Sequence, residues 1–233
     1  MLVLGIDDAG RGPVIGPMIL AGALLTSEQE KLLKRHNVRD SKIVLHPERI
    51  KLAKIIKQNS VSFKVIKTSP EAIDDSLAKG TNLNTLEAKI AAVIINSINH
   101  QRMRKEKIKV ILDCPSTNTL SWKNVLLKYI EHKENLVVSC EHRADANHVS
   151  VSAASILAKV TREEEIKKLK KQFEKYGNTG SGYPSDPATI EFLKKHGKEL
   201  KSSGLFRKSW ATWKEIFPQE SAKEKGQATL DSF

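Results

Sequence analysis

Residues 2–13 of the chain have the sequence LVLGIDDAGRGP, and this stretch decides the fold. Its first five residues are an unbroken apolar run, which is typical of a central strand covered on both faces. Two aspartates, Asp7 and Asp8, follow at once, and a tight glycine-rich loop then turns the chain. We therefore predict a buried first strand that carries carboxylates at its carboxyl end.

The rest of the first two thirds of the chain alternates between strand and helix patterns. The first three strand patterns follow one another closely, which favours an antiparallel meander. Helical patterns over residues 83–103 and 121–132 each lead into a further strand, as in parallel crossover units. The expected strands are residues 2–6, 14–25, 61–65, 109–113 and 136–140. The sequence therefore predicts an α/β fold with a mixed five-stranded sheet flanked by helices.

The last third of the chain predicts helices that leave the sheet, and then a polar tail. A long helix is expected over residues 148–175, and a later one begins where Asp186 precedes Pro187. The composition after Pro218 cannot bury enough apolar surface to offset the entropy of ordering. The expected division is an α/β domain over 1–172, a small helical subdomain over 173–217 and a flexible tail over 218–233.

The overall charge favours a polyanionic partner such as nucleic acid. Lys and Arg number 39 against 27 Asp and Glu, a formal charge of +12, although a lysine-rich solvated surface would give the same balance. No apolar run is long enough to cross a bilayer and no basic segment precedes the first strand, so we expect a cytoplasmic protein. Cys114 and Cys140 have neither zinc-site nor secreted-framework spacing, and they follow neighbouring predicted strands.

Carboxylates recur at the ends of three predicted strands. Asp7 and Asp8 follow the first, Asp113 ends the fourth, and Asp145 lies just beyond the fifth. Because the carboxyl ends of parallel strands meet at one edge of a sheet, these side chains should converge. Such a cluster is unstable without protons or hard divalent cations, and Mg²⁺ or Mn²⁺ suits an all-oxygen site. The simpler interpretation is that strand-end aspartates form turns and cap helices.

Several segments together resemble the type 2 ribonuclease H family, including its archaeal members, over about residues 1–215. In order, they are residues 5–13, 40–42, 112–115, 143–162 and 180–187. The resemblance implies an RNase H-like fold. It also implies an endonuclease that hydrolyses the RNA strand of RNA/DNA hybrids and cuts 5′ of single ribonucleotides embedded in duplex DNA. The products would carry 5′-phosphate and 3′-hydroxyl ends.

The resemblance implies that Asp7, Asp8, Asp113 and Asp145 are the catalytic carboxylates and bind two divalent ions, Mg²⁺ or Mn²⁺. The family usually has Glu at the position of Asp8, so the side chain here is shorter by one methylene. Neighbouring residues of an extended strand point to opposite faces. The strand must therefore bend at Asp8, or Asp8 must act through its carbonyl or a bridging water.

The resemblance also implies a substrate-binding set. Gly10, Arg11 and Gly12 would read the ribose 2′-hydroxyl, because glycines let a backbone approach a nucleotide closely. Lys42 would contact a phosphate, and Tyr183 would stack on the following deoxyribose. On the residues alone, a plain glycine turn, a surface lysine and a core tyrosine are the competing interpretations.

The end of the chain resembles the motif by which proteins bind the sliding clamp PCNA. Gln227 is followed three residues later by Leu230, and Phe233 lies three residues further on. Residues three apart eclipse in a 3₁₀ turn, so the two apolar side chains would form one plug for a pocket. The usual motif has two adjacent aromatics and this chain has one, so a polar tail without function is the alternative.

Other functions stay open at this stage. An RNase H-fold nuclease could act on DNA alone, and a non-catalytic hybrid-binding module could recruit a clamp. His142 and His148 flank Asp145, where a base is conceivable but solvated or capping histidines are the simpler interpretation. The favoured interpretation is a monomeric ribonuclease H that acts in DNA replication and ribonucleotide excision repair.

Overall fold

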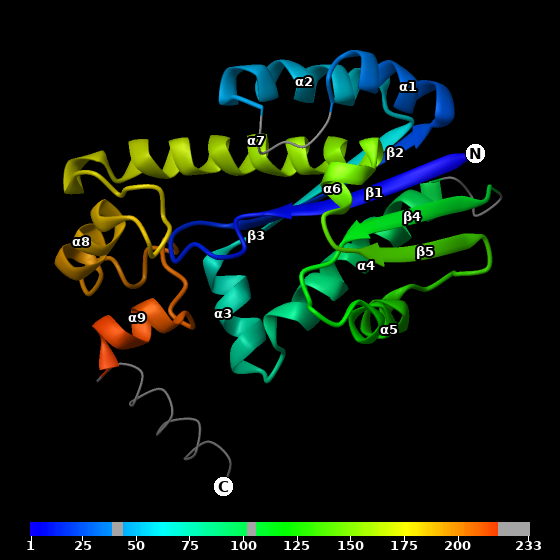
Figure 1. Cartoon of the computed structure of the whole chain (residues 1–233). Coiled ribbons are helices and arrows are strands. Elements are labelled where there is room, and N and C mark those ends of the chain that lie inside the picture. Colours follow the sequence, from blue (N-terminus) through cyan, green and yellow to red (C-terminus); the bar gives the residue numbers. More distant parts are fainter. Residues whose placement is uncertain (39–43, 102–105, 219–233) are drawn as a thin grey trace, which may run out of the picture. The chain divides into compact units, whose positions relative to one another are not determined.

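The computed structural model describes residues 1–38, 44–101 and 106–218 (Figure 1). These residues form two compact units. The sheet unit comprises Met1–Arg11, Met18–Lys67 and Thr81–Glu164, and the helical unit comprises Gly12–Pro17, Thr68–Gly80 and the described residues from Glu165 onward. The two units are defined by packing alone and are interleaved along the chain. The division into functional domains at residue 172 stays a prediction.

The sheet has five strands in the order β3-β2-β1-β4-β5. β1 (Leu2–Ala9) pairs antiparallel with β2 (Met18–Thr26) and parallel with β4 (Ile108–Asp113). β4 pairs parallel with β5 (Leu136–Glu141), and β3 (Ser62–Thr68) forms the other edge. The predicted mixed five-stranded sheet is therefore confirmed.

The second strand begins four residues later than the sequence pattern predicts. β2 starts at Met18, whereas Val14 and Gly16 donate backbone hydrogen bonds to the carbonyls of Gly182 and Leu205 at 2.8 and 3.0 Å. Gly16 has a φ of +84°, a left-handed conformation that interrupts an extended strand. The apolar run thus serves two cores, because its first residues pack in the helical unit and its remainder enters the sheet.

Helices cover both faces of the sheet (Figure 1). On one face, α1 (Ser27–Arg35), α2 (His46–Asn59) and the first part of α7 (Val149–Gln172) share an apolar core with β2. On the other face lie α4 (Leu83–Gln101), packed on β2, and α5 (Thr119–Tyr129), packed on α4 and β5. This layering buries both sides of the central strands, as their apolar runs predict.

The helical unit is built around its own aromatic core. It contains α3 (Pro70–Ala78), the end of α7, a short 3₁₀ turn at Glu174–Tyr176, α8 (Pro187–His196) and α9 (Ala211–Ile216). As predicted, Asp186 caps α8, and its side chain accepts a hydrogen bond from the amide of Ala188 at 3.0 Å. No helix in the described ranges combines the length and apolar character needed to cross a bilayer.

Candidate active site

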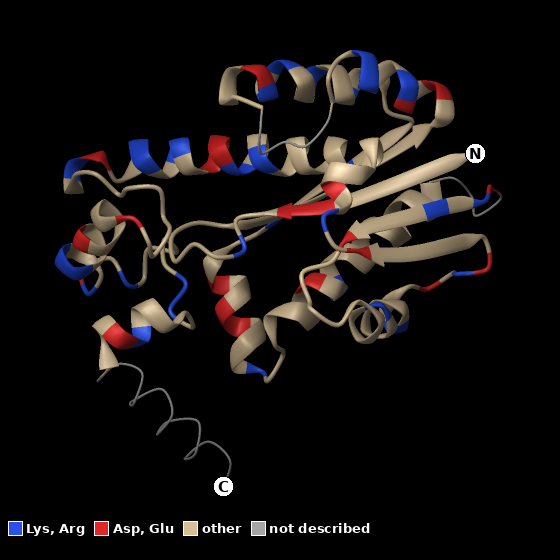
Figure 2. Cartoon of the chain, viewed as in Figure 1, with Lys and Arg blue, Asp and Glu red and all other residues tan. Residues whose placement is uncertain are grey.

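The carboxyl ends of three strands bring acidic residues to one edge of the sheet (Figure 2). Ile6 of β1 pairs with Leu112 of β4, so Asp7 and Asp113 occupy the next position on each strand. Asp113 in turn pairs with Glu141, the last residue of β5. The parallel register therefore aligns these three carboxylates across neighbouring strands.

Asp7 and Asp8 lie on opposite faces of β1. A Cβ on Gly5 would lie 2.1 Å from the backbone of Ser150, so the face that carries residues 5 and 7 is closely covered by the start of α7. Asp8 is on the other face, and it lines a pocket together with Glu87 of α4. β1 keeps its pairing with β2 through Ala9.

The pocket at this edge is lined by both acidic and apolar residues. Asp7, Asp8, Glu87 and Asp113 line it, together with apolar side chains that include Trp122. Glu87 was not predicted from the sequence. No group of three or more His, Cys, Asp or Glu side chains within the described ranges is arranged so that it could hold a metal ion as it stands.

Asp7 is strongly affected by this environment. It is 7% exposed, and burial raises the pKa of its carboxyl well above the usual range, with further increases from the charges of Asp8 and Asp113. Hydrogen bonds from Ser155 and from the amide of Asp8, the latter at 2.8 Å, act in the opposite direction. The carboxyl therefore favours a proton or a nearby cation over an isolated charge.

Asp145 lies on the short helix α6 (Ala144–Asn147), which is tied to the sheet by its first residue. The amide of Ala144 donates to Oδ1 of Asp113 at 2.9 Å, and the hydroxyl of Ser152 donates to the carbonyl of Asp145 at 2.6 Å. Arg143, just before α6, has a φ of +56° and turns the chain sharply. Asp145 is buried, but it is not among the residues that line the pocket.

A second polar pair lies beside this edge. Nε2 of His148 is 2.7 Å from Glu141, whose other oxygen accepts from the hydroxyl of Ser139 at 2.7 Å. These contacts, with Ser139 first and His148 next, lower the pKa of Glu141. The ring of His148 is thus held by a carboxylate.

The glycine-rich loop passes from one unit to the other. Gly10 has a φ of +82° and Arg11 ends the sheet unit, whereas Gly12 belongs to the helical unit. There, Nε1 of Trp210 donates to the carbonyl of Gly12 at 3.0 Å, and a Cβ on Gly12 would lie 3.8 Å from the ring of Tyr183.

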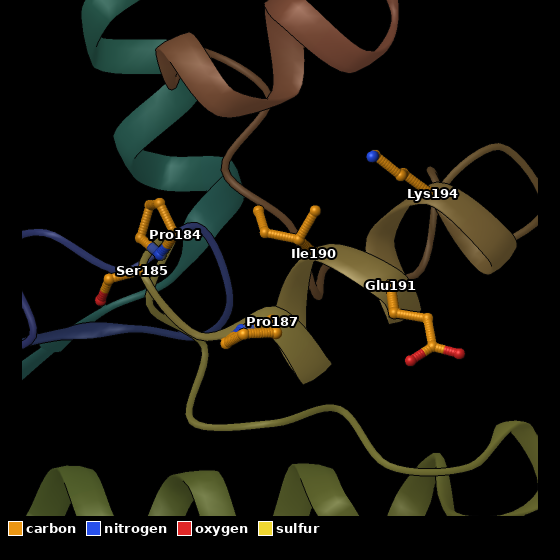
Figure 3. Close-up of a pocket in the computed structure, with 6 residues that line it drawn as sticks. All are labelled: Pro184, Ser185, Pro187, Ile190, Glu191 and Lys194. Carbon is orange, nitrogen blue, oxygen red and sulfur yellow. The ribbon is translucent and has the colours of Figure 1, made fainter.

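Tyr183 is 40% exposed, so it does not fill the core of the helical unit. Immediately after it, a shallow open pocket lies along α8, and Figure 3 shows its lining side chains. They are Pro184, Ser185, Pro187, Ile190, Glu191 and Lys194. Lys42 and the tail residues Gln227, Leu230 and Phe233 lie outside the described residues.

The two cysteines are free thiols at the same end of the sheet. Cys140 pairs in register with Leu112 of β4, and Cys114 directly follows the end of that strand. Burial and, after it, the nearby Cys114 together raise the pKa of Cys140 to about 12. The Cys140 thiol is therefore held in its neutral form.

Comparison with known proteins agrees with the motifs. Residues 4–213 match the Ribonuclease HII family. The chain is 37% identical to Ribonuclease HII of Pyrococcus furiosus, covering all of this chain and 98% of the relative. The crystal structure of ribonuclease H2 from Pyrococcus horikoshii has a TM-score of 0.80 at 35% identity, over 94% of this chain and 98% of that one.

A further similar structure is that of the PCNA:RNase HII complex from Archaeoglobus fulgidus, with a TM-score of 0.75 and 35% identity, over 90% of this chain and 95% of that one. The chain is thus an endoribonuclease that acts on RNA/DNA hybrids and on ribonucleotides embedded in DNA. Its motifs, its sheet and its relatives agree, and the chain belongs to the ribonuclease HII family.

Proposed function

We propose that the phosphodiester bond is hydrolysed at the acidic edge of β1 and β4, with two Mg²⁺ or Mn²⁺ ions bound by Asp7, Asp8, Asp113 and Asp145. The observation that carries this proposal is the burial of Asp7 beside Asp8 and Asp113, which raises its pKa. The donor set fits hard cations, because it consists of carboxylate oxygens. When bound, the ions would activate a water and stabilise the leaving oxygen, which gives 5′-phosphate and 3′-hydroxyl ends.

The residues of the chain hold this edge in place. Asp113 accepts the amide of Ala144 and so fixes α6, the helix that carries Asp145. Ser155 and the amide of Asp8 hold the carboxyl of Asp7 in one orientation. These supports lie on strands and helices, which fix the backbone positions of the carboxylates.

The substrate is read by the Gly10-Arg11-Gly12 loop, which approaches the ribose 2′-hydroxyl, and by Tyr183, which stacks on the next deoxyribose. The exposed ring of Tyr183 and its closeness to Gly12 support a joint site. Lys42 contributes a phosphate contact, a role that rests on its motif alone.

A cleavage assay on a duplex with one embedded ribonucleotide, with and without divalent metal, tests the chemistry. Cutting should require metal and should occur 5′ of the ribonucleotide. An all-DNA duplex of the same sequence is the matched control, and equal cutting of it would favour a DNA nuclease. Asp145→Asn should abolish turnover and leave hybrid binding nearly unchanged; a chain that binds hybrids without turnover would be a binding module.

We also propose that the chain binds a sliding clamp through Gln227, Leu230 and Phe233. The relative from Archaeoglobus fulgidus, 35% identical to this chain, was solved in complex with PCNA. The motif at the end of this chain agrees with such a partner, with one aromatic in place of the usual two. Co-migration of the chain with PCNA on a sizing column is the direct test.

A further inference from the structure

Glu87 is a buried carboxylate to which the proposed chemistry gives no role. It lies in α4, is 1% exposed, and lines the pocket with Asp7, Asp8 and Asp113. A carboxylate buried near three others is unfavourable unless a cation lies beside it. That cation is Arg11, whose Nε is 3.1 Å from Oε1 of Glu87.

The guanidinium of Arg11 is held at each of its three nitrogens. Besides the ion pair with Glu87, Nη1 donates to the carbonyl of Pro115 at 3.0 Å and Nη2 donates to Oδ1 of Asn84 at 2.5 Å. Because the guanidinium is planar and rigid, three partners fix its plane as well as its position. Arg11 is therefore tied to α4 and to the segment that directly follows Asp113 and Cys114 on β4.

The loop needs such an anchor. Gly10 adopts a φ of +82° and has no side chain with which to hold its conformation. Glycine loses more backbone freedom on ordering than any other residue, so a loop built on it is costly to fix. Asn84 is itself anchored, because Nε1 of the buried Trp122 donates to its carbonyl at 3.0 Å. These contacts thus link α5 and α4, through Asn84 and Arg11, to the backbone of the loop.

We propose that Glu87 is a positioning residue for ribonucleotide recognition, which acts through Arg11 to fix the backbone of the Gly10–Gly12 loop. The inference rests on the proposed function of that loop in reading the 2′-hydroxyl. Arg11 then contributes to recognition by orienting its own main chain, while its guanidinium stays bound to the protein. Loss of Glu87 should misplace the loop and leave the metal requirement intact.

Kinetics on the duplex with one ribonucleotide test this in Glu87→Ala, Glu87→Gln, Arg11→Ala and the double variant Arg11→Ala/Glu87→Ala. Glu87→Ala should lower kcat/KM by about 10- to 100-fold, since misplacement of about 1 Å can have an effect of that size. Glu87→Gln keeps an acceptor oxygen and should restore part of the loss. The double variant should be no slower than Arg11→Ala, because both changes break the same link.

The metal concentration that gives half-maximal activity should not change in any of these variants. Asn99→Ala is the matched control, since Asn99 is buried on the same helix and its Nδ2 donates to the carbonyl of His132 at 3.1 Å. It should lower thermal stability and leave kcat/KM within about twofold, because Asn99 touches neither Arg11 nor the pocket. Asn84→Ala, which keeps the carbonyl bound by Trp122, supplies a second measurement if Glu87→Ala folds poorly, and should also lower kcat/KM.

Additive losses in the double variant, or a shifted metal requirement in Glu87→Gln, would mean that Glu87 acts on the acidic pocket directly, which overturns the inference. Full activity of Glu87→Ala alongside an impaired Arg11→Ala would also overturn it, while leaving the loop's proposed function standing. Full activity of Arg11→Ala would overturn the inference as well and leave the backbone reading by the loop standing, since the loop would then need no anchor.

Discussion

The charged form of the Asp7 side chain is destabilised by its surroundings in the folded protein. Its pKa in the folded protein is raised above 3.8 by burial and by the charges of Asp8 and Asp113. Between pH 3.8 and the raised value, the folded state therefore binds more protons than the unfolded state. The stability contributed by this group falls as pH rises through that window, so at neutral pH Asp7 destabilises the metal-free protein.

Asp7→Asn should stabilise the metal-free protein at neutral pH while lowering cleavage by about 100- to 1000-fold. The melting temperature should rise by about 2–4 °C for each kcal/mol of strain relieved. Thermal melts at pH 5 and pH 8 in the presence of a chelator measure the effect, which should be larger at pH 8. A variant less stable than wild type at both pH values would show that the hydrogen bond with Ser155 outweighs the strain.

Asp8→Glu restores the residue that the family usually has. Asp8 is half-buried beside Glu87, and the longer side chain extends into the same pocket. We expect activity within about threefold of wild type or above it, because Glu supplies the same carboxylate donor at this position. Steady-state kinetics decide, and an inactive variant would mean that the backbone at this position has adapted to Asp.

Tyr183→Ala should slow cleavage at an isolated ribonucleotide far more than it affects folding. The ring is 40% exposed and supports little core, so the loss of stability should stay below about 1 kcal/mol. Phe192→Ala in the same unit is the matched control, since Phe192 is 3% exposed and its truncation should cost about 3–5 kcal/mol. Equal losses of stability in the two variants would mean that Tyr183 is a core residue.

The sequence predicts residues whose chemistry is local and misses those whose role is set by distant contacts. Asp7 and Asp113 were predictable because each directly follows an apolar strand pattern. Glu87 lies in the middle of a helical pattern, where a charged residue normally faces solvent. Only the packing of α4 against the sheet turns it toward Arg11, 76 positions away in the chain, and no local pattern encodes that.

At the scale of elements, α8 depends on one capping carboxylate. Asp186 accepts from the amide of Ser181 at 2.6 Å and from that of Ala188 at 3.0 Å, and its own amide donates to the carbonyl of Tyr183 at 3.1 Å. The hydrogen bonds from Ser181, and then that from Ala188, lower the pKa of its carboxyl. The same residue therefore begins the helix and closes the loop that carries Tyr183.

Asp186→Ala should lower the melting temperature at pH 7 and slow cleavage, because both the cap and the Tyr183 loop lose a support. A lowered pKa contributes stability that is present above about pH 3.8 and is lost as pH falls through the folded value. The difference in melting temperature between variant and wild type should therefore shrink as pH falls toward 3. Ser185→Ala is the control, and a difference that is independent of pH would contradict the charge-based explanation.

The helices and strands were largely predictable from the sequence, whereas the segments against which they pack were less predictable. The five strands and the long helices α4 and α7 follow from periodicity, and their ends agree within a few residues. Helices α1 and α3 were not predicted. The start of β2 was wrong because an apolar run looks the same whether it pairs in a sheet or packs among aromatic side chains. Val14 and Ile15 pack among aromatic side chains, in a core with Phe206 and Trp213.

For the whole molecule, the sequence predicts an α/β domain followed by a helical subdomain, whereas the packing forms two units whose segments are interleaved along the chain. The chain leaves the sheet unit at Gly12, returns at Met18, and leaves again at Thr68 and Glu165. Such returns depend on contacts between distant segments, which composition does not reveal. One consequence is that the glycine-rich loop is divided between the two units, because Arg11 ends a segment of the sheet unit and Gly12 begins a segment of the helical unit.

Clamp binding and catalysis should separate, because no residue assigned to cleavage lies beyond Trp213. Deletion of residues 219–233 should leave cleavage of a short oligonucleotide unchanged and abolish binding to PCNA. Within the tail, Phe233→Ala and Leu230→Ala should each weaken binding by at least about 2 kcal/mol, since a short docking motif relies on a few buried anchors. Gln227→Ala should have a smaller effect, as a partly hydrated polar contact. Calorimetric titration of each variant into PCNA measures these affinities. Either no binding by wild type or equal binding by Phe233→Ala would show that the tail is not a clamp-binding motif.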